Sequence, residues 1–118
     1  CILGAGPGGL QLAYFLQTSG RDVVVLERAS EVASFYSVYP RHRRLISLNK
    51  RFTGRGHPDF NLRHDWHSLL SDNSTLLFTR YSRERFPAAD DFRRYVNDYA
   101  TFTGVRDVIL FGWDAESV

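Results

Sequence analysis

The sequence has 118 residues, of which 43% are hydrophobic and 24% are charged, with 15 Lys and Arg against 13 Asp and Glu. This composition fits one globular domain and excludes collagenous and intrinsically disordered chains. No run of about 20 apolar residues is present, so we expect no membrane span in this segment. The single cysteine, Cys1, excludes an internal disulfide and a Cys-x-x-Cys redox pair, and we expect it to be buried in a strand.

The chain contains no Met and enters an apolar run at its first residues. We therefore expect a fragment of a longer protein, truncated at both ends. A signal peptide or other targeting segment would then lie outside it.

The first twenty residues predict a strand, a turn and a helix. Residues 1–3 form the end of an apolar strand, and residues 4–9 hold four of the nine glycines. A helix is expected over 10–19, because its apolar positions fall on one face. Pro7 suits the first turn of that helix, and Gly20 suits its C-terminal cap.

Two further strands and one helix follow from the hydrophobic pattern. The run over 23–26 predicts a parallel strand covered on both faces, which ends at Glu27 and completes a βαβ unit. A helix is expected over 91–103, where apolar residues recur at helical spacing, and Gly104 ends it. Residues 108–111 predict a short strand.

The middle of the chain, residues 30–87, shows no sustained periodicity. A structureless connection of this length is uncommon, so we expect either a functional cover over a ligand or short elements that periodicity does not reveal. Residues 63–70 are a candidate short helix. Residues 75–78 predict either a buried strand or the packing edge of the cover.

The glycine turn carries the chemistry. Gly4, Gly6 and Gly9 form a G-x-G-x-x-G motif between a strand and a helix, and Glu27 follows 18 residues after Gly9. In this motif the first glycine permits the tight turn, the second lets the backbone approach a pyrophosphate, and the third lets the helix pack on the strand. The phosphates meet amide donors at the helix N-terminus, although Pro7 has no amide to give. Glu27 would accept hydrogen bonds from ribose hydroxyls, which favours FAD or NAD over NADP in this pocket.

These residues resemble a known family. Residues 4–10, together with Leu26-Glu27-Arg28, are similar to the N-terminal FAD site of flavoproteins with two dinucleotide-binding domains, such as flavin-containing monooxygenases and pyridine nucleotide-disulfide reductases. Residues 39–54, 60–66 and 81–83 resemble an endoplasmic-reticulum member of this group. The similarity spans essentially the whole chain.

The resemblance implies an α/β fold, namely a Rossmann-like FAD-binding domain. Residues 1–118 would be its N-terminal part, and residues 30–87 a long cover or insertion within it. It also implies an FAD-dependent, NAD(P)H-linked oxidoreductase of the endoplasmic reticulum lumen, with quality-control and degradation components as partners. NAD(P)H would bind through a domain outside this segment. Monooxygenases have Gly-Gly-x-Trp soon after the second strand, whereas this chain has Ala33-Ser34-Phe35-Tyr36, which argues against monooxygenase chemistry.

The predicted cofactor-binding residues are Gly4, Ala5, Gly6, Pro7, Gly8, Gly9, Glu27, Arg28, Asn49 and Ala115. By resemblance, Arg28 neighbours the adenosine phosphate or ribose, Asn49 contacts the flavin side, and Ala115 contacts adenine through its backbone. An exposed strand end is the alternative for Arg28, and a turn is the alternative for Asn49. Because the flavin supplies the redox chemistry, no catalytic side chain is assigned.

Three histidines and one sequon need separate interpretation. His57, His64 and His67 lack a cysteine partner, so we expect loop histidines and no metal site, with a general-acid role near a flavin left open. Asn73-Ser74-Thr75 is an N-glycosylation sequon in a turn-like, exposed stretch, compatible with a luminal protein.

Three rival functions stay open. An NAD-binding Rossmann dehydrogenase would show strands alternating with helices after Glu27. A nucleic-acid-binding module would use the basic cluster of residues 41–51 with Tyr39 and Phe52 as stacking groups, but it leaves the glycine motif unexplained, so no nucleic-acid partner is expected. A redox-inactive flavin-fold interaction protein would keep the motif and lose the chemistry.

Overall fold

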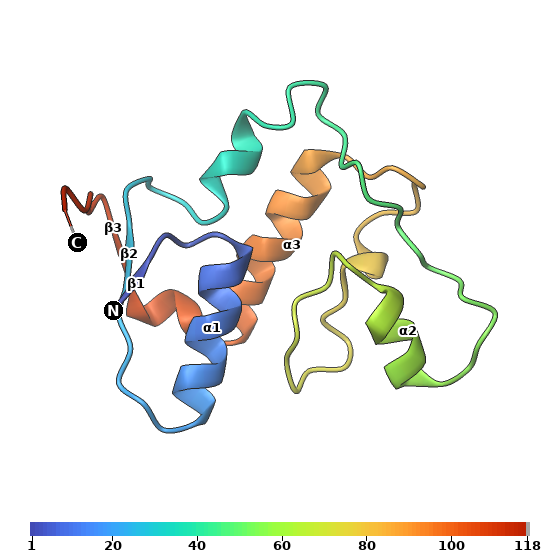
Figure 1. Cartoon of the computed structure of the whole chain (residues 1–118), viewed down its shortest axis with the longest axis horizontal. Helices are drawn as coiled ribbons and strands as arrows, with labels where there is room; N and C mark the ends of the chain where they lie inside the picture. The colour runs from blue at the N-terminus through green and yellow to red at the C-terminus, as the bar shows by residue number, and fades with distance from the viewer. Residues whose placement is uncertain (118) are drawn as a thin grey trace.

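Three short parallel strands lie side by side in the order β1, β2, β3 in the computed structural model, which describes residues 1–117 (Figure 1). The strands span Ile2–Leu3 (β1), Val25–Glu27 (β2) and Ile109–Phe111 (β3). Val25 lies between Ile2 and Ile109 in the register. This strand order matches the first half of a Rossmann sheet and confirms the expected α/β, Rossmann-like fold.

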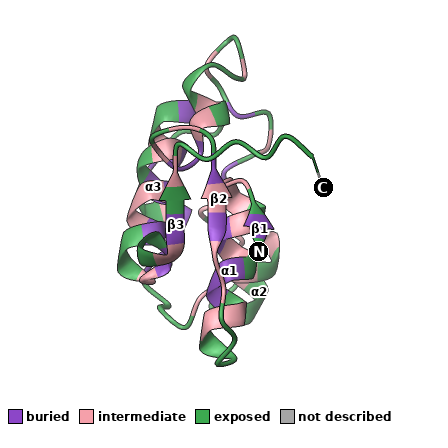
Figure 2. Ribbon diagram, turned by 90° about the vertical axis from the view of Figure 1, so that its left-hand side faces the viewer, coloured by how far each residue is buried: buried purple, intermediate pink, exposed green. Residues whose placement is uncertain are grey.

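Within residues 1–117, helices cover one face of the sheet. Ile2, Val25 and Ile109 are buried in the core shared with the helices, which lie behind the sheet in Figure 2. Leu3 and Leu110 point the other way and are 51% and 43% exposed. The expectation of a strand covered on both faces is therefore wrong for this chain, because both long helices pack on the same side.

The first helix, α1, spans Pro7–Thr18 and begins three residues earlier than predicted. Gly6 is its N-cap and Pro7 its first residue, a position that tolerates the missing amide. Gly20 follows the helix with a φ of +70°, as its predicted capping role requires. The expectation for Cys1 is wrong, since this residue precedes β1 and is exposed.

The long helix α3 spans Ala89–Phe102 and confirms the prediction within two residues at its start. Asp90 and Asp91 lie in its first turn, where they complement the positive end of the helix dipole. Its buried face carries Phe92, Tyr95, Val96 and Tyr99. Gly104 ends the helix at a φ of +74°. The short 3-10 helix η3 (Val105–Val108) then leads into β3.

The middle of the chain contains η1 (Ser34–Ser37), α2 (Pro58–His64) and η2 (Phe78–Arg80). The helix predicted over 63–70 is wrong, because the Asp65 carboxylate accepts the amides of His67 and Ser68 and turns the chain away. No strand forms over 75–78, so the strand alternative is wrong, and Leu76 and Phe78 pack into the core instead.

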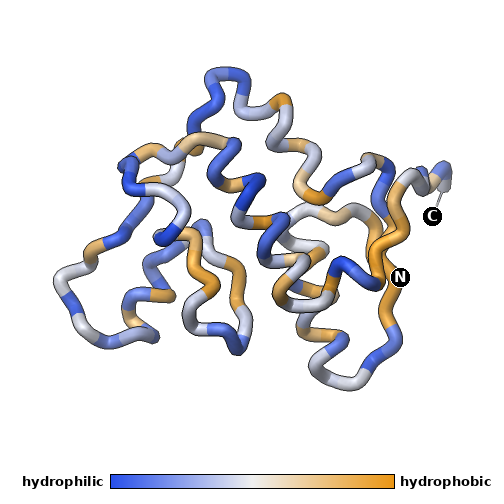
Figure 3. Tube along the Cα trace, turned by 180° about the vertical axis from the view of Figure 1, so that it is seen from behind, coloured by the Kyte–Doolittle hydropathy of each residue, from blue (hydrophilic) through white to orange (hydrophobic). Residues whose placement is uncertain are grey.

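Tyrosine hydroxyls attach this middle segment to the helices. Tyr95 Oη accepts the Leu69 amide at 2.6 Å, and Tyr99 donates to the Leu70 carbonyl at 2.7 Å. Figure 3 shows hydrophobic stretches both in the strands and in the part of this segment that packs inward. No helix within residues 1–117 is long and apolar enough to cross a membrane. The function of residues 30–87 as a cover over the flavin stays a prediction.

Candidate functional site

Two glycines of the motif are required by the backbone itself. Gly4 has a φ of +92°, in the region that disfavours side chains, and its amide donates to the Leu26 carbonyl at 2.7 Å. A Cβ on Gly9 would lie 2.1 Å from the Gly4 carbonyl oxygen. These two glycines therefore let the start of α1 touch the end of β1, as the fingerprint predicts.

The other two glycines face open space. A Cβ added to Gly6 or Gly8 would meet no atom within 4 Å. Within residues 1–117, no hydrogen bond takes up the amides of Gly8 and Gly9 at the first turn of α1. Free amides at the positive end of a helix form a site for an anion, and an added Cβ on Gly6 would fill the space that such an anion needs. The residues present thus fit a pyrophosphate.

Glu27 joins the glycine turn to the end of β2. Its carboxylate is 8% exposed and accepts the Ala5 amide at 2.7 Å and the Ala29 amide at 2.8 Å. A carboxylate offers about four acceptor positions, so two remain for ribose hydroxyls. Glu27 therefore has a structural function, and its contact with the ribose stays a prediction.

A cavity of about 350 Å³ opens beside Glu27. Its walls are Leu3, Gly4, Leu26, Glu27, Arg28, Trp113, Asp114 and Ala115. Four of the predicted cofactor-binding residues, Gly4, Glu27, Arg28 and Ala115, thus line one space at the carboxyl ends of β1 and β2. Ligands of open α/β sheets bind in this position.

Sequence reasoning missed Trp113 and Asp114 in this cavity. Gly112 has a φ of +76°, and the Trp113 amide donates to the Glu27 carbonyl at 3.1 Å, so the chain crosses the end of β2 after leaving β3. The signal in the sequence is the Gly-Trp pair directly after the third strand. It places an exposed indole where a planar base can pack.

Asn49 does not join the predicted site. Its Nδ2 donates to the Ser82 carbonyl at 2.8 Å, and its amide donates to the Arg85 carbonyl at 2.9 Å. Its buried Oδ1 has no partner within residues 1–117, and no hydrogen bond in that range links it to the glycine turn. Asn49 therefore fastens two parts of the middle segment together, and its contact with the flavin stays a prediction.

A second cavity, of about 500 Å³, has mostly aromatic walls. It is lined by Phe35, Tyr36, Tyr39, Pro40, Leu45, Ile46, Ser47, Trp66, His67 and Phe92. Burial raises the pKa of the Tyr36 hydroxyl, so this group stays protonated and can donate a hydrogen bond. The 3-10 helix η1, which supplies Phe35 and Tyr36 to the cavity, is linked to the glycine turn, because the Ala33 amide donates to the Ala5 carbonyl at 3.0 Å.

His67 is the histidine in the wall of this aromatic cavity. Burial lowers its pKa below 6.5 and outweighs the attraction of the Asp65 carboxylate, while Lys50 lowers it further. Both ring nitrogens are buried without a partner in residues 1–117. His67 is therefore neutral at pH 7 and offers one donor and one acceptor.

The basic cluster is largely engaged within the chain. Arg43 donates to the Tyr36 carbonyl and pairs with Asp90 at 2.7 Å. Arg44 pairs with Glu84, and the amino group of Lys50 lies 4.2 Å from the centre of the Trp66 ring. These contacts brace the middle segment and leave its cationic groups less free to bind a phosphate.

The three candidate histidines point to separate places. His64 contacts the Phe60 carbonyl at 2.8 Å, while His67 packs on the Phe78 ring at 5.0 Å. His57 is the N-cap of α2. Over the described part of the chain, no three His, Cys, Asp or Glu side chains gather as they would around a metal ion.

Comparison with known proteins agrees with this geometry. Residues 1–106 match the model of the family described as pyridine nucleotide-disulphide oxidoreductase. FAD-dependent oxidoreductase domain-containing protein 2 of Danio rerio is 53% identical over 114 residues, and the Mus musculus protein of that name is 57% identical over 105 residues. The aligned residues cover 97% and 89% of this chain but only 16% of each relative. These matches confirm the resemblance drawn from residues 39–54, 60–66 and 81–83.

More distant matches extend to monooxygenases and reductases. Flavin-containing monooxygenase FMO GS-OX-like 8 of Arabidopsis thaliana is 28% identical over 128 residues, which cover all of this chain and 27% of that protein. The crystal structure of OTEMO with FAD and NADP superposes with a TM-score of 0.66 at 22% identity, over 94% of this chain and 18% of OTEMO. Bacillithiol disulfide reductase Bdr of Staphylococcus aureus gives 0.66 at 19% identity, over 94% of this chain and 27% of Bdr. The structural likenesses confirm the fold.

Proposed function

The chain belongs to the pyridine nucleotide-disulphide oxidoreductase family, and from that premise we propose that it is the FAD-binding segment of a flavin-dependent oxidoreductase that takes electrons from NADH or NADPH. The OTEMO structure with FAD and NADP and the names of the curated relatives support this proposal. The nicotinamide nucleotide would bind through a part of the protein outside this segment.

The proposal depends on one observation above all. The open space at Gly6 and the Gly8 and Gly9 amides, which no hydrogen bond within residues 1–117 takes up, lie close in the chain to Ala5, whose amide orients the Glu27 carboxylate. A pyrophosphate fits the amides, and an adenosine ribose fits the remaining acceptor positions of the carboxylate. Arg28 lines the same cavity and places a positive charge beside the adenosine end of the cofactor.

The remaining residues would orient the two ends of the cofactor. Trp113 and the Ala115 backbone line the cavity that would take the adenine. The aromatic cavity with Tyr36 and His67 suits a planar ring system, with one protonated hydroxyl and one neutral imidazole at its wall. When bound, FAD supplies reversible two-electron redox chemistry that no side chain of this segment offers.

An absorption spectrum tests the proposed activity. The full-length protein is purified and measured without air, before and after addition of NADH or, separately, NADPH. Flavin bands that bleach with one nucleotide would support the oxidoreductase and identify its donor. Flavin bands that neither nucleotide bleaches would favour the redox-inactive interaction protein, and a colourless protein that cannot be reconstituted with FAD would favour the dehydrogenase.

We further propose that the protein acts in the lumen of the endoplasmic reticulum, together with components that handle misfolded proteins. The resemblance of residues 39–54 and 60–66 to an endoplasmic-reticulum flavoprotein supports this location. The exposed sequon at Asn73 is compatible with it. Protease protection of the endogenous protein in intact microsomes would support it, and digestion without detergent would contradict it.

A further inference from the structure

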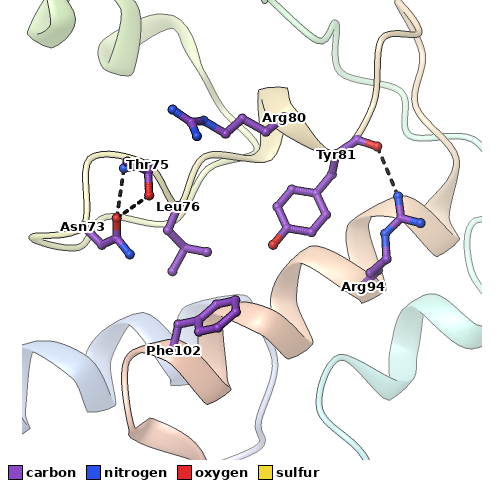
Figure 4. Close-up of a pocket in the computed structure, with 7 residues that line it drawn as sticks. All are labelled: Asn73, Thr75, Leu76, Arg80, Tyr81, Arg94 and Phe102. Carbon is purple, nitrogen blue, oxygen red and sulfur yellow. Dashed lines mark hydrogen bonds between the residues drawn. The ribbon is translucent and has the colours of Figure 1, made fainter.

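A groove of about 480 Å³ lies between α3 and the loop of residues 71–77, which carries the sequon (Figure 4). Its walls are Asn73, Thr75, Leu76, Arg80, Tyr81, Arg94 and Phe102. None of these residues belongs to the dinucleotide site. The groove is therefore separate from the proposed FAD site.

The atom of the sequon that receives a sugar is Asn73 Nδ2, and it belongs to an exposed side chain. Asn73 Oδ1 accepts both the Thr75 amide at 3.0 Å and the Thr75 hydroxyl at 2.7 Å. The two hydrogen bonds fix the amide plane of the side chain, as the dashed lines in Figure 4 show. Within residues 1–117, no hydrogen bond takes up Asn73 Nδ2, and all three sequon residues are exposed.

The loop that carries the sequon is anchored on both sides. The Asp72 amide donates to Tyr14 Oη at 2.8 Å, and Leu76 is buried in the core. Tyr14 lies seven residues along α1 from Pro7, which is about 10 Å along the helix axis from the glycine turn. A bulky group on Asn73 would therefore leave the dinucleotide site free.

Part of the groove wall is apolar, because Phe102 and Leu76 line it. Phe102, the last residue of α3, is 68% exposed, and Leu76 lies between it and the loop in Figure 4. Tyr81 is held by a hydrogen bond from its hydroxyl to Asp98 at 2.7 Å. Arg80 and Arg94 also line the groove and carry N–H donors, of which Arg94 Nη2 donates to the Tyr81 carbonyl at 3.2 Å. An apolar floor with polar donors around it matches a sugar ring, whose C–H face is apolar and whose edge carries hydroxyl and acetamido groups.

We propose that Asn73 is N-glycosylated and that the first N-acetylglucosamine of the glycan packs in this groove against Phe102. In the transfer step Nδ2 forms a bond to C1 of the sugar, the C1–O bond to a lipid-linked pyrophosphate donor breaks, and Nδ2 loses one proton. No oxidation or reduction is involved. The modification of the native protein rests on the proposed luminal location, since the donor lipid is presented in that compartment.

Site occupancy tests the modification directly. The tryptic peptide of residues 64–80 contains Asn73 as its only asparagine, so peptide N-glycosidase treatment in heavy-oxygen water labels this one residue. Full-length protein is made in cultured animal cells twice, with its native N-terminus and with an appended secretory signal. Thr75→Ala should abolish the label, and the matched variant Ser74→Ala should keep it.

Comparing the two preparations distinguishes two questions: whether Asn73 can be glycosylated, and whether the native protein enters the lumen. Label in both supports the proposal and the luminal location. Label only with the appended signal supports Asn73 as a competent site and contradicts the luminal location. Absence of label with the appended signal overturns the proposal.

The sugar contact is tested by coupling between residues. Thr75→Ala and Phe102→Ala are combined in a double-mutant cycle, with the melting temperature measured for protein from the same cells. The loss of glycan should lower the melting temperature in the parent, and this shift should disappear in the Phe102→Ala background. Protein made in bacteria, which carries no glycan, should show no coupling. Equal shifts in both backgrounds would overturn the seating of the sugar.

Discussion

The βαβ unit of residues 1–29 and the middle segment of residues 30–87 are built on different principles. In the first, the backbone sets the structure: a positive φ at Gly4, the absence of a side chain at Gly9, and parallel strands. In the second, side chains hold irregular backbone in place through tyrosine hydroxyls and arginine ion pairs. The comparison explains why the anion site lies in the first region and the aromatic cavity in the second.

The difference also sets how each region should respond to substitution. In the βαβ unit, a side chain added to a glycine that touches other backbone should strongly destabilise the fold. A side chain added to a glycine with no neighbouring atoms should have little effect on stability. A side-chain framework loses stability in small steps, one hydrogen bond at a time. The following predictions use this contrast, from the largest expected effect to the smallest.

The Gly9→Ala substitution should produce the largest effect. Its Cβ would lie 2.1 Å from the Gly4 carbonyl oxygen, so α1 must move away from β1 and stability should fall by about 3 kcal/mol or more. Gly8→Ala is the matched control, because its Cβ meets nothing and Ala favours a helix by about 1 kcal/mol over Gly. Urea unfolding of the full-length protein measures both. Equal stability of the two variants would show that the helix start is not closely packed.

The Glu27→Ala substitution should reduce both stability and FAD affinity. It leaves the buried Ala5 amide and the Ala29 amide without their acceptor. An unpaired buried group lowers the free energy of unfolding by about 1–3 kcal/mol. Unfolding of the FAD-free protein isolates the structural part, and titration with FAD measures the rest. Asp22→Asn, at an exposed carboxylate outside this cavity, should change neither quantity appreciably. Loss of FAD affinity without loss of stability would contradict the structural function of Glu27.

The Tyr95→Phe substitution should weaken the middle segment selectively. It leaves the Leu69 amide unpaired, so we expect a loss of about 1–3 kcal/mol and faster amide exchange over 65–78 than in β2. Tyr39→Phe should have no such effect, because the Tyr39 hydroxyl makes no hydrogen bond within residues 1–117. Uniform acceleration across both regions would show that they unfold as one unit.

His67 should contribute a small pH dependence. Its pKa is lowered below 6.5 in the folded chain, so the folded state keeps the ring neutral while the unfolded chain takes up a proton first as the pH falls. Stability from this group is therefore complete above pH 6.5 and declines below it, toward the folded pKa. His67→Gln should flatten this part of the pH profile of unfolding. An unchanged slope would contradict the burial effect.

Sequence patterns predicted the backbone-determined region well. The glycine spacing and the two apolar runs located α1, β1 and β2 to within a few residues, because each depends on short-range geometry. The contact of Glu27 with the ribose stays a prediction. Helix α3 was equally accessible from the spacing of Phe92, Tyr95 and Tyr99. Gly4, Glu27, Arg28 and Ala115 do line one cavity.

The side-chain framework was much less predictable. The helix expected over 63–70 fails because one carboxylate, Asp65, competes for the amides of His67 and Ser68. The contacts of Asn49 join it to segments more than thirty residues away, which no local pattern records. Trp113 reaches the site only because β3 lies next to β2.

The FAD content of the full-length Gly6→Val variant tests the central claim most directly. A Cβ at Gly6 has no atom within 4 Å beyond its chain neighbours, and the φ of −77° and ψ of 175° suit Val, so the variant should fold as the parent does. The side chain would occupy the space assigned to the pyrophosphate, so the purified variant should carry no flavin. A folded Gly6→Val protein with parental flavin content would contradict the assignment of the glycine turn as the FAD site.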